Sequence, residues 1–137
     1  MTKILTTVAL LGCAILPILM DAGPTHLFNS HWDAHARSHL VWMLATNFFL
    51  FWLAVYHLWY RKEEVLPGLI SLCILLGYSV SAITMPLYDG VFLGEGGVEP
   101  RPFGIPINLI WFSALLIIQI ISLFLVYRRR KQVRGRG

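Results

Sequence analysis

Residues 106–127 read PINLIWFSALLIIQIISLFLVY and are followed by RRRKQVRGRG at residues 128–137. A helix needs roughly 20 apolar residues to cross a bilayer, and this run supplies them before a sharp change to basic residues. Three other apolar runs, at residues 4–20, 39–59 and 66–87, are of similar length. We therefore expect an all-α fold, an integral membrane four-helix bundle that forms a single domain over residues 1–137.

The composition agrees with that fold class. Hydrophobic residues make up 57% and charged residues 13% of the 137 residues, with a mean hydropathy of +0.68. Soluble domains carry about 25% charged residues, and disordered chains are more polar still, so the composition argues against both classes. The two cysteines, Cys13 and Cys73, lie inside apolar runs, which argues against a disulfide scaffold.

The first apolar run has a competing interpretation as a signal peptide. It follows Lys3 and contains Pro17, and a basic residue before an apolar stretch is also how a cleaved signal begins. No A-x-A-like cleavage site precedes Asp21. We therefore expect residues 4–20 to be retained as a span.

Lysine and arginine fall almost entirely on one side of this topology. One side holds Lys3, Arg61, Lys62, Arg128, Arg129, Arg130, Lys131, Arg134 and Arg136, and the other holds Arg37 and Arg101. Because basic loops stay in the cytoplasm, we expect both termini to be cytoplasmic. The basic tail at residues 128–137 should contact the lipid bilayer and not nucleic acid. We expect a multi-pass membrane protein. Its location would be the inner or plasma membrane in a prokaryote, or an endomembrane in a eukaryote.

Two longer segments, at residues 21–38 and 88–105, form the outer loops. The second is rich in glycine and proline, and long irregular loops are often lids, so we expect a lid there. The first, with residue 39, holds four of the five histidines: His26, His31, His35 and His39. Ser30 has the chemistry of a helix N-cap, and a helix starting there would place His31, His35 and His39 on one stripe.

This stripe has a metal-binding interpretation. Histidines four apart on a helix can ligate one ion, so His31, His35 and His39 are candidate ligands for a divalent metal. Additional ligands on the same side would be His26, Asp21, Asp89, Glu95 or Glu99. No motif in the sequence names a cofactor.

The same region has an acid–base interpretation. Histidine is the commonest general acid or base, and the candidate catalytic residues are Asp21, His26, His35, Arg37 and His39. Arg37 would hold an anionic group of the substrate. The substrate would be a hydrophobic small molecule that enters from the bilayer, and isomerase- or cyclase-like chemistry suits a site without a nucleophile.

Polar residues inside the spans extend this candidate site. Asn47 lies below His39 on the same broad face of its span, and Tyr78 lies in the outer half of the third span. With Trp42 they would line a cavity for a hydrophobic ligand. Side-chain amides more often hydrogen-bond between helices, and Gly68 would allow close helix approach.

Two interpretations without chemistry remain open. Histidine and tryptophan are common at the level of lipid headgroups, so residues 21–39 would simply end a helix at the membrane surface. Alternatively, the chain would be an accessory subunit of a membrane complex, or a homo-oligomer, and this segment would dock the partner.

Residues 21–39 also resemble a family signature. Asp21, Thr25-His26, Phe28-Asn29, Trp32, His35-Ala36-Arg37 and His39 are similar to the D…TH.FNP.WPPHARFH segment of an uncharacterised family of small four-span membrane proteins. The resemblance implies a shared polar set that adds Asn29 to the candidate residues. The sequence departs from the signature at Ser30, Asp33, Ala34 and Ser38, and His31 is outside it. The resemblance therefore indicates which residues are of interest, but it does not imply a particular reaction.

Overall fold

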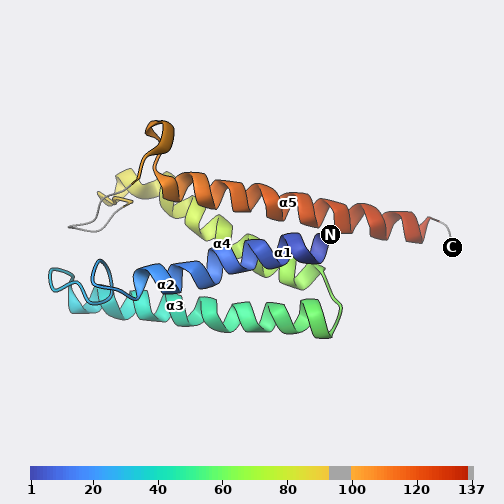
Figure 1. The fold of residues 1–137 in the computed structure, drawn as a ribbon, viewed down its shortest axis with the longest axis horizontal. Helices are drawn as coiled ribbons and strands as arrows, with labels where there is room; N and C mark the ends of the chain where they lie inside the picture. Colours follow the sequence, from blue (N-terminus) through green and yellow to red (C-terminus); the bar gives the residue numbers. More distant parts are fainter. Residues whose placement is uncertain (93–99, 136–137) are drawn as a thin grey trace.

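The computed structural model describes residues 1–92 and 100–135. Its described part confirms the expected all-α four-helix bundle, and all four helical rods are long and apolar enough to cross a membrane (Figure 1). The first rod comprises α1 (Thr2–Leu10), the π-helical segment η1 (Leu11–Ile15) and α2 (Leu16–Asp21). The second comprises α3 (Ala34–Val55) and η2 (Tyr56–Tyr60), and the third comprises α4 (Val65–Thr84) and η3 (Met85–Leu87). The fourth is α5 (Ile107–Arg134), preceded in its loop by the short η4 (Pro102–Gly104).

The bundle has two chemically different ends. The N-terminus, the last turns of α5 and the turn at residues 61–64 lie at one end, which we call the basic end (Figure 1). The loop at residues 22–33 and the loop residues 88–92 and 100–106 lie at the other, which we call the histidine end. The antiparallel order of the rods agrees with the topology expected from the sequence.

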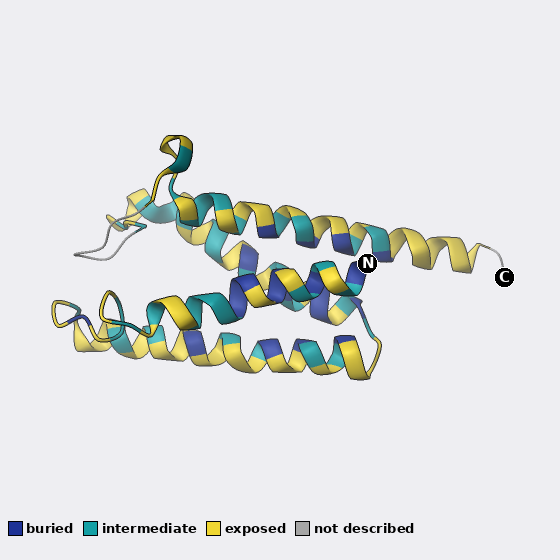
Figure 2. Ribbon diagram, viewed as in Figure 1, coloured by how far each residue is buried: buried dark blue, intermediate teal, exposed yellow. Residues whose placement is uncertain are grey.

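Burial is concentrated in the half of the bundle nearer the basic end (Figure 2). α1 packs against α5 and α4, while α3 packs against η1 and α4. The core cluster is apolar and comes from every rod: Leu10, Cys13, Ala14, Phe51, Ala54, Leu75 and Leu115. In contrast, α2 has no buried residue, and α4 has none beyond Leu75. The rods are therefore held together mainly away from the histidine end.

Two glycines allow the rods of this half to approach closely. A Cβ atom on Gly12 would lie 2.6 Å from Leu115 Cδ1, and one on Gly68 would lie 2.5 Å from Leu123 Cδ2. The expected close approach at Gly68 is thus present. At Gly12 the backbone carbonyl, which lies in the π-helical segment, accepts a hydrogen bond from Trp111 Nε1 at 3.3 Å. This contact ties the middle of the first rod to α5.

The fourth helix is longer than expected from hydropathy alone. It was expected to end near residue 127, where the apolar run stops, but α5 continues to Arg134 with Gly135 as its C-cap. Arginine and lysine are good helix formers, and no glycine or proline interrupts residues 128–134. The basic tail is therefore mostly helix.

Candidate functional site

The histidine end is built around the start of α3. Asp33 caps this helix, because its Oδ1 accepts a hydrogen bond from the His35 backbone N–H at 2.7 Å. The expected cap at Ser30 is wrong, and so is the helical stripe that began at His31. Asn29 explains the difference: its Oδ1 and its carbonyl accept the N–H groups of His31 and Trp32, at 2.9 and 3.2 Å. These bonds hold residues 30–32 in a turn.

Replacing Asp33 by alanine should loosen the first turn of α3, which carries His35. We expect the free energy of unfolding to fall by about 1 kcal/mol, because an exposed N-cap hydrogen bond is lost. Denaturant titration of the purified protein in detergent micelles would measure this loss. Asp33→Asn is the matched control, since asparagine caps equally well. An equal loss in both variants would contradict the capping role.

A first pair of candidate residues joins the end of α2 to the following loop. His26 Nδ1 lies 3.8 Å from Asp21 Oδ1 and 3.0 Å from Thr25 Oγ1. The Asp21 and His26 side chains are each about a quarter exposed, and the His26 ring packs edge-on against Trp32 with 5.3 Å between centroids. When His26 carries a second proton, this geometry allows an ion pair with Asp21.

A second pair lies on α3. His35 Nε2 and His39 Nε2 are 3.0 Å apart, within hydrogen-bonding distance, and the two rings meet edge-on with 4.5 Å between centroids. One ring must donate its Nε2–H to the lone pair of the other. Both side chains are exposed, so a ligand has access to the pair.

A shallow groove begins directly beside this pair. Its lining residues follow one side of α3 at helical spacing: His39, Trp42, Met43, Thr46 and Asn47. Its volume is about 370 Å³, and the Trp42 ring stacks on the His39 ring with 6.0 Å between centroids. From His39 to Asn47 the groove extends about 12 Å along the helix, at 1.5 Å per residue. The structure thus brings together four candidate residues: His35, His39, Trp42 and Asn47.

The remaining candidates lie elsewhere. Arg37 is two residues from both His35 and His39, and positions two apart on a helix do not share a face. Asn29 is buried and uses its amide inside its own loop, where Nδ2 donates to the Thr25 carbonyl at 3.3 Å. Tyr78 stacks on Phe112, with 3.9 Å between centroids, between α4 and α5. The expected site is therefore divided into the Asp21–His26 pair and the α3 groove.

His35 and His39 have a geometry that would suit two ligands of one metal ion. Two histidine nitrogens bound to one zinc ion lie about 3.3 Å apart, close to the separation of His35 and His39. Within residues 1–92 and 100–135, no group of three or more His, Cys, Asp or Glu side chains is placed to hold a metal. Two of the expected additional ligands, Glu95 and Glu99, and the centre of the expected lid lie outside the described residues.

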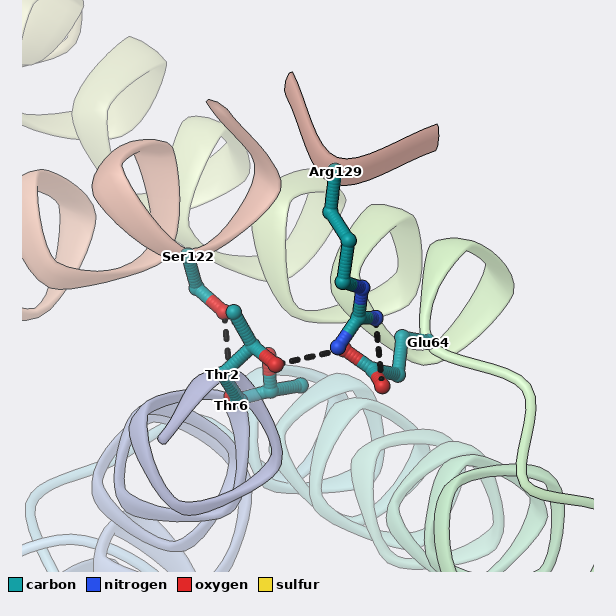
Figure 3. Close-up of polar contacts among 5 residues, drawn as sticks. All are labelled: Thr2, Thr6, Glu64, Ser122 and Arg129. Atoms are coloured by element: carbon teal, nitrogen blue, oxygen red, sulfur yellow. Dashed lines mark hydrogen bonds and ion pairs between the residues drawn. The ribbon is translucent and has the colours of Figure 1, made fainter. Parts of the chain in front are cut away.

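A polar network at the basic end was not predicted from the sequence. Glu64, buried, accepts hydrogen bonds from Thr2 Oγ1 at 2.5 Å and from Arg129 Nη2 at 2.8 Å (Figure 3). Ser122 Oγ donates to the Thr2 carbonyl at 3.1 Å and lies 2.9 Å from Thr6 Oγ1. The network therefore links α1, α5 and the residue that precedes α4. A carboxylate placed directly before an apolar helix, at an end with an excess of arginine, is the sequence signal that would have indicated it.

The charge state of Glu64 reflects this environment. Burial alone raises the pKa of Glu64, but the hydrogen bonds from Thr2 and Arg129 and the charges of Arg129 and Lys3 outweigh it. The pKa of this carboxyl is therefore lowered below its ordinary range. Glu64 is the ionised centre of the network.

Comparison with known proteins does not indicate a function for these residues. No protein family matches the chain, and neither a curated protein nor a solved structure matches it. The function must be argued from the residues themselves.

Proposed function

We propose that the chain is a multi-pass membrane protein that binds a hydrophobic small molecule in the α3 groove and exchanges a proton with it through His35 and His39. The observation that carries this proposal is the hydrogen bond between the two Nε2 atoms at the mouth of the groove. The excess of lysine and arginine at the basic end supports a cytoplasmic position for that end. The histidine end would then face the opposite side.

The groove suits a ligand with one polar group and an apolar body. The polar group would lie against His39, and the apolar body would contact Trp42 and Met43, which are 67% and 47% exposed. Thr46 and Asn47 offer hydrogen bonds deeper along the same side. A lipid-soluble molecule would reach this groove sideways from the bilayer, without passing through the packed core.

The histidine pair supplies the acid–base chemistry. A ligand can give its proton to Nδ1 of the ring that donates the Nε2–H; that ring then passes its Nε2–H to the second ring, which returns its own Nδ1–H to the ligand. Both rings are neutral again at the end. Moving a proton between two positions of one molecule is the basis of isomerisation and needs no redox cofactor. The Asp21–His26 pair would act separately, as a second proton-exchanging group on the same end.

The proposal predicts a molecule that co-purifies with the protein. Organic extraction of protein purified in mild detergent, followed by mass spectrometry, should find a compound at near-stoichiometric level. We expect its occupancy to fall at least about tenfold in His39→Ala and in Asn47→Leu, because each removes a groove contact worth more than about 1.4 kcal/mol. His57→Ala, at the basic end, is the control and should keep the compound.

A second measurement separates catalysis from binding. With the identified compound as substrate, His35→Ala and His39→Ala should lower turnover by about 10²–10⁴-fold, the usual contribution of a general acid or base. If the wild type binds the compound but does not convert it, the protein is a binding protein and the acid–base role is contradicted. Stoichiometric metal by elemental analysis would favour a His-rich metal-binding protein or metalloenzyme instead.

One observation favours a different function, that of an accessory subunit. Part of the groove side of α3 is turned away from the bundle, since Trp42, Met43 and Thr46 are exposed. Polar side chains such as Thr46 on an outward side of a membrane helix often hydrogen-bond to a partner helix. Co-purification of a partner subunit, lost in Thr46→Leu, with no small molecule bound would support this function.

A further inference from the structure

The last turns of α5 form a basic helical extension of the bundle. The apolar part of the helix ends at Tyr127, and the helix continues to Arg134 (Figure 1). Seven residues in a helix span about 10 Å, which is enough to cross the headgroup layer of roughly 5–8 Å on one side of the hydrocarbon core. If the bundle lies in a membrane as proposed above, residues 128–134 are at the level of the lipid headgroups.

One side of this extension is a built cationic surface. Arg129, Arg130, Val133 and Arg134 line a shallow depression of about 360 Å³. They share a side because Arg129 and Val133, and likewise Arg130 and Arg134, are four residues apart on the helix. Arg128 and Lys131 fall on the other side, where the Arg128 guanidinium lies 5.6 Å from the centroid of the Phe124 ring.

The positive charge of this surface is only partly neutralised by the chain. The carboxylate side chains at the basic end among the described residues are Glu63 and Glu64. Glu63 pairs with His57 at 2.9 Å, and Glu64 pairs with Arg129 at 2.8 Å. Arg130 and Arg134 are exposed, so their guanidinium groups are available to an external anion.

We propose that Arg129, Arg130 and Arg134 bind the phosphate of an anionic phospholipid headgroup. Arginine matches phosphate geometry with paired N–H donors, and a juxtamembrane basic cluster is attracted to anionic lipid. Val133, 70% exposed between the arginines, favours a lipid over a soluble anion because it offers an apolar contact beside the phosphate. This inference rests on the proposed membrane insertion but not on the function of the histidine end.

The site is connected to the packing of the bundle. Arg129 lines the cationic surface and also donates to Glu64, which in turn accepts from Thr2 (Figure 3). A lipid phosphate that holds the Arg129 side chain in place also favours the geometry of its bond to Glu64. Anionic lipid should therefore stabilise the folded bundle as well as bind to it.

The test compares the full chain in nanodiscs of phosphatidylcholine with nanodiscs that also contain phosphatidylglycerol. We expect the anionic lipid to raise the melting temperature by several degrees, and native mass spectrometry to detect retained phosphatidylglycerol. The double variant Arg130→Gln/Arg134→Gln should bind this lipid about tenfold more weakly, because two of three phosphate-binding arginines are lost. Arg128→Gln/Lys131→Gln removes the same charge from the other side of the helix and should keep most of the effect.

Three results would overturn the proposal. If the two double variants lost phosphatidylglycerol binding equally, the lipid would be attracted by the overall positive charge of the helix and not by a specific site. Equal stabilisation by inorganic phosphate in phosphatidylcholine nanodiscs would mean a site for a soluble anion. Failure of the wild type to assemble into nanodiscs would contradict the proposed membrane insertion and therefore also the lipid site that depends on it.

Discussion

Replacing Gly68 by valine is expected to destabilise the bundle by about 3 kcal/mol, at the upper end of what overpacking a tight core usually costs. The first atom of the new side chain would lie 2.5 Å from Leu123 Cδ2 and 3.0 Å from Gln119 Nε2. Leu123 is half-buried and would have to change its side-chain conformation, whereas Gln119 is fully buried and has to be displaced from the interface between α4 and α5. Denaturant titration in micelles, followed by circular dichroism, would measure the change.

Gly77 provides a matched control in the same helix. No atom lies within 4 Å of the position that its Cβ would occupy, so Gly77→Val meets open space. We expect this variant to stay within about 0.5 kcal/mol of the wild type, as surface substitutions usually do. Equal stability of the two variants would contradict the close packing of α4 on α5 at Gly68.

Loss of the Glu64 carboxylate should have the next largest effect. In Glu64→Ala, Thr2 and Arg129 lose their common acceptor, and we expect a destabilisation of about 2 kcal/mol. That value is below the usual cost of breaking a buried ion pair, because the Arg129 side chain is 57% exposed. Glu63→Ala is the control: the Glu63 side chain is 41% exposed and pairs with His57, and we expect at most about 0.5 kcal/mol.

The same carboxylate makes the stability of the bundle depend on acidic pH. The pKa of Glu64 is lowered in the folded protein, so its ionised form contributes stability above the ordinary carboxyl pKa. That contribution disappears as the pH falls through the lowered value. We expect the decline of wild-type stability in acid to be reduced in Glu64→Ala and unchanged in Glu63→Ala. An identical decline in all three proteins would contradict the role of Glu64.

The sequence predicted the number and order of the rods well, because an apolar run of bilayer length is a local property of the chain. It did not predict the start of α3. Ser30 and Asp33 are both good N-caps, and the choice depends on the hydrogen bonds that Asn29 makes within the preceding loop. It also missed the last turns of α5, since hydropathy marks the end of an apolar run and not the end of a helix.

The proximity of candidate residues was predictable where they share one helix. His39, Trp42 and Asn47 line one groove because their spacing follows the helical period. Tyr78 is on a different rod, α4. Its distance from the groove depends on how the helices pack, which the helical periodicity of the sequence does not determine. The contact between Glu64 and Arg129 was missed for the same reason, since the two residues are 65 positions apart.

The uneven burial of the bundle has a consequence for its fluctuations. Regions with few buried contacts open locally at a lower free energy than the packed core. The rods should therefore separate transiently from the histidine end, while the Glu64 network and the contacts at Gly12 and Gly68 keep the other half closed. We therefore expect the amide hydrogens of the two halves to exchange as two cooperative units, with the half at the histidine end exchanging faster.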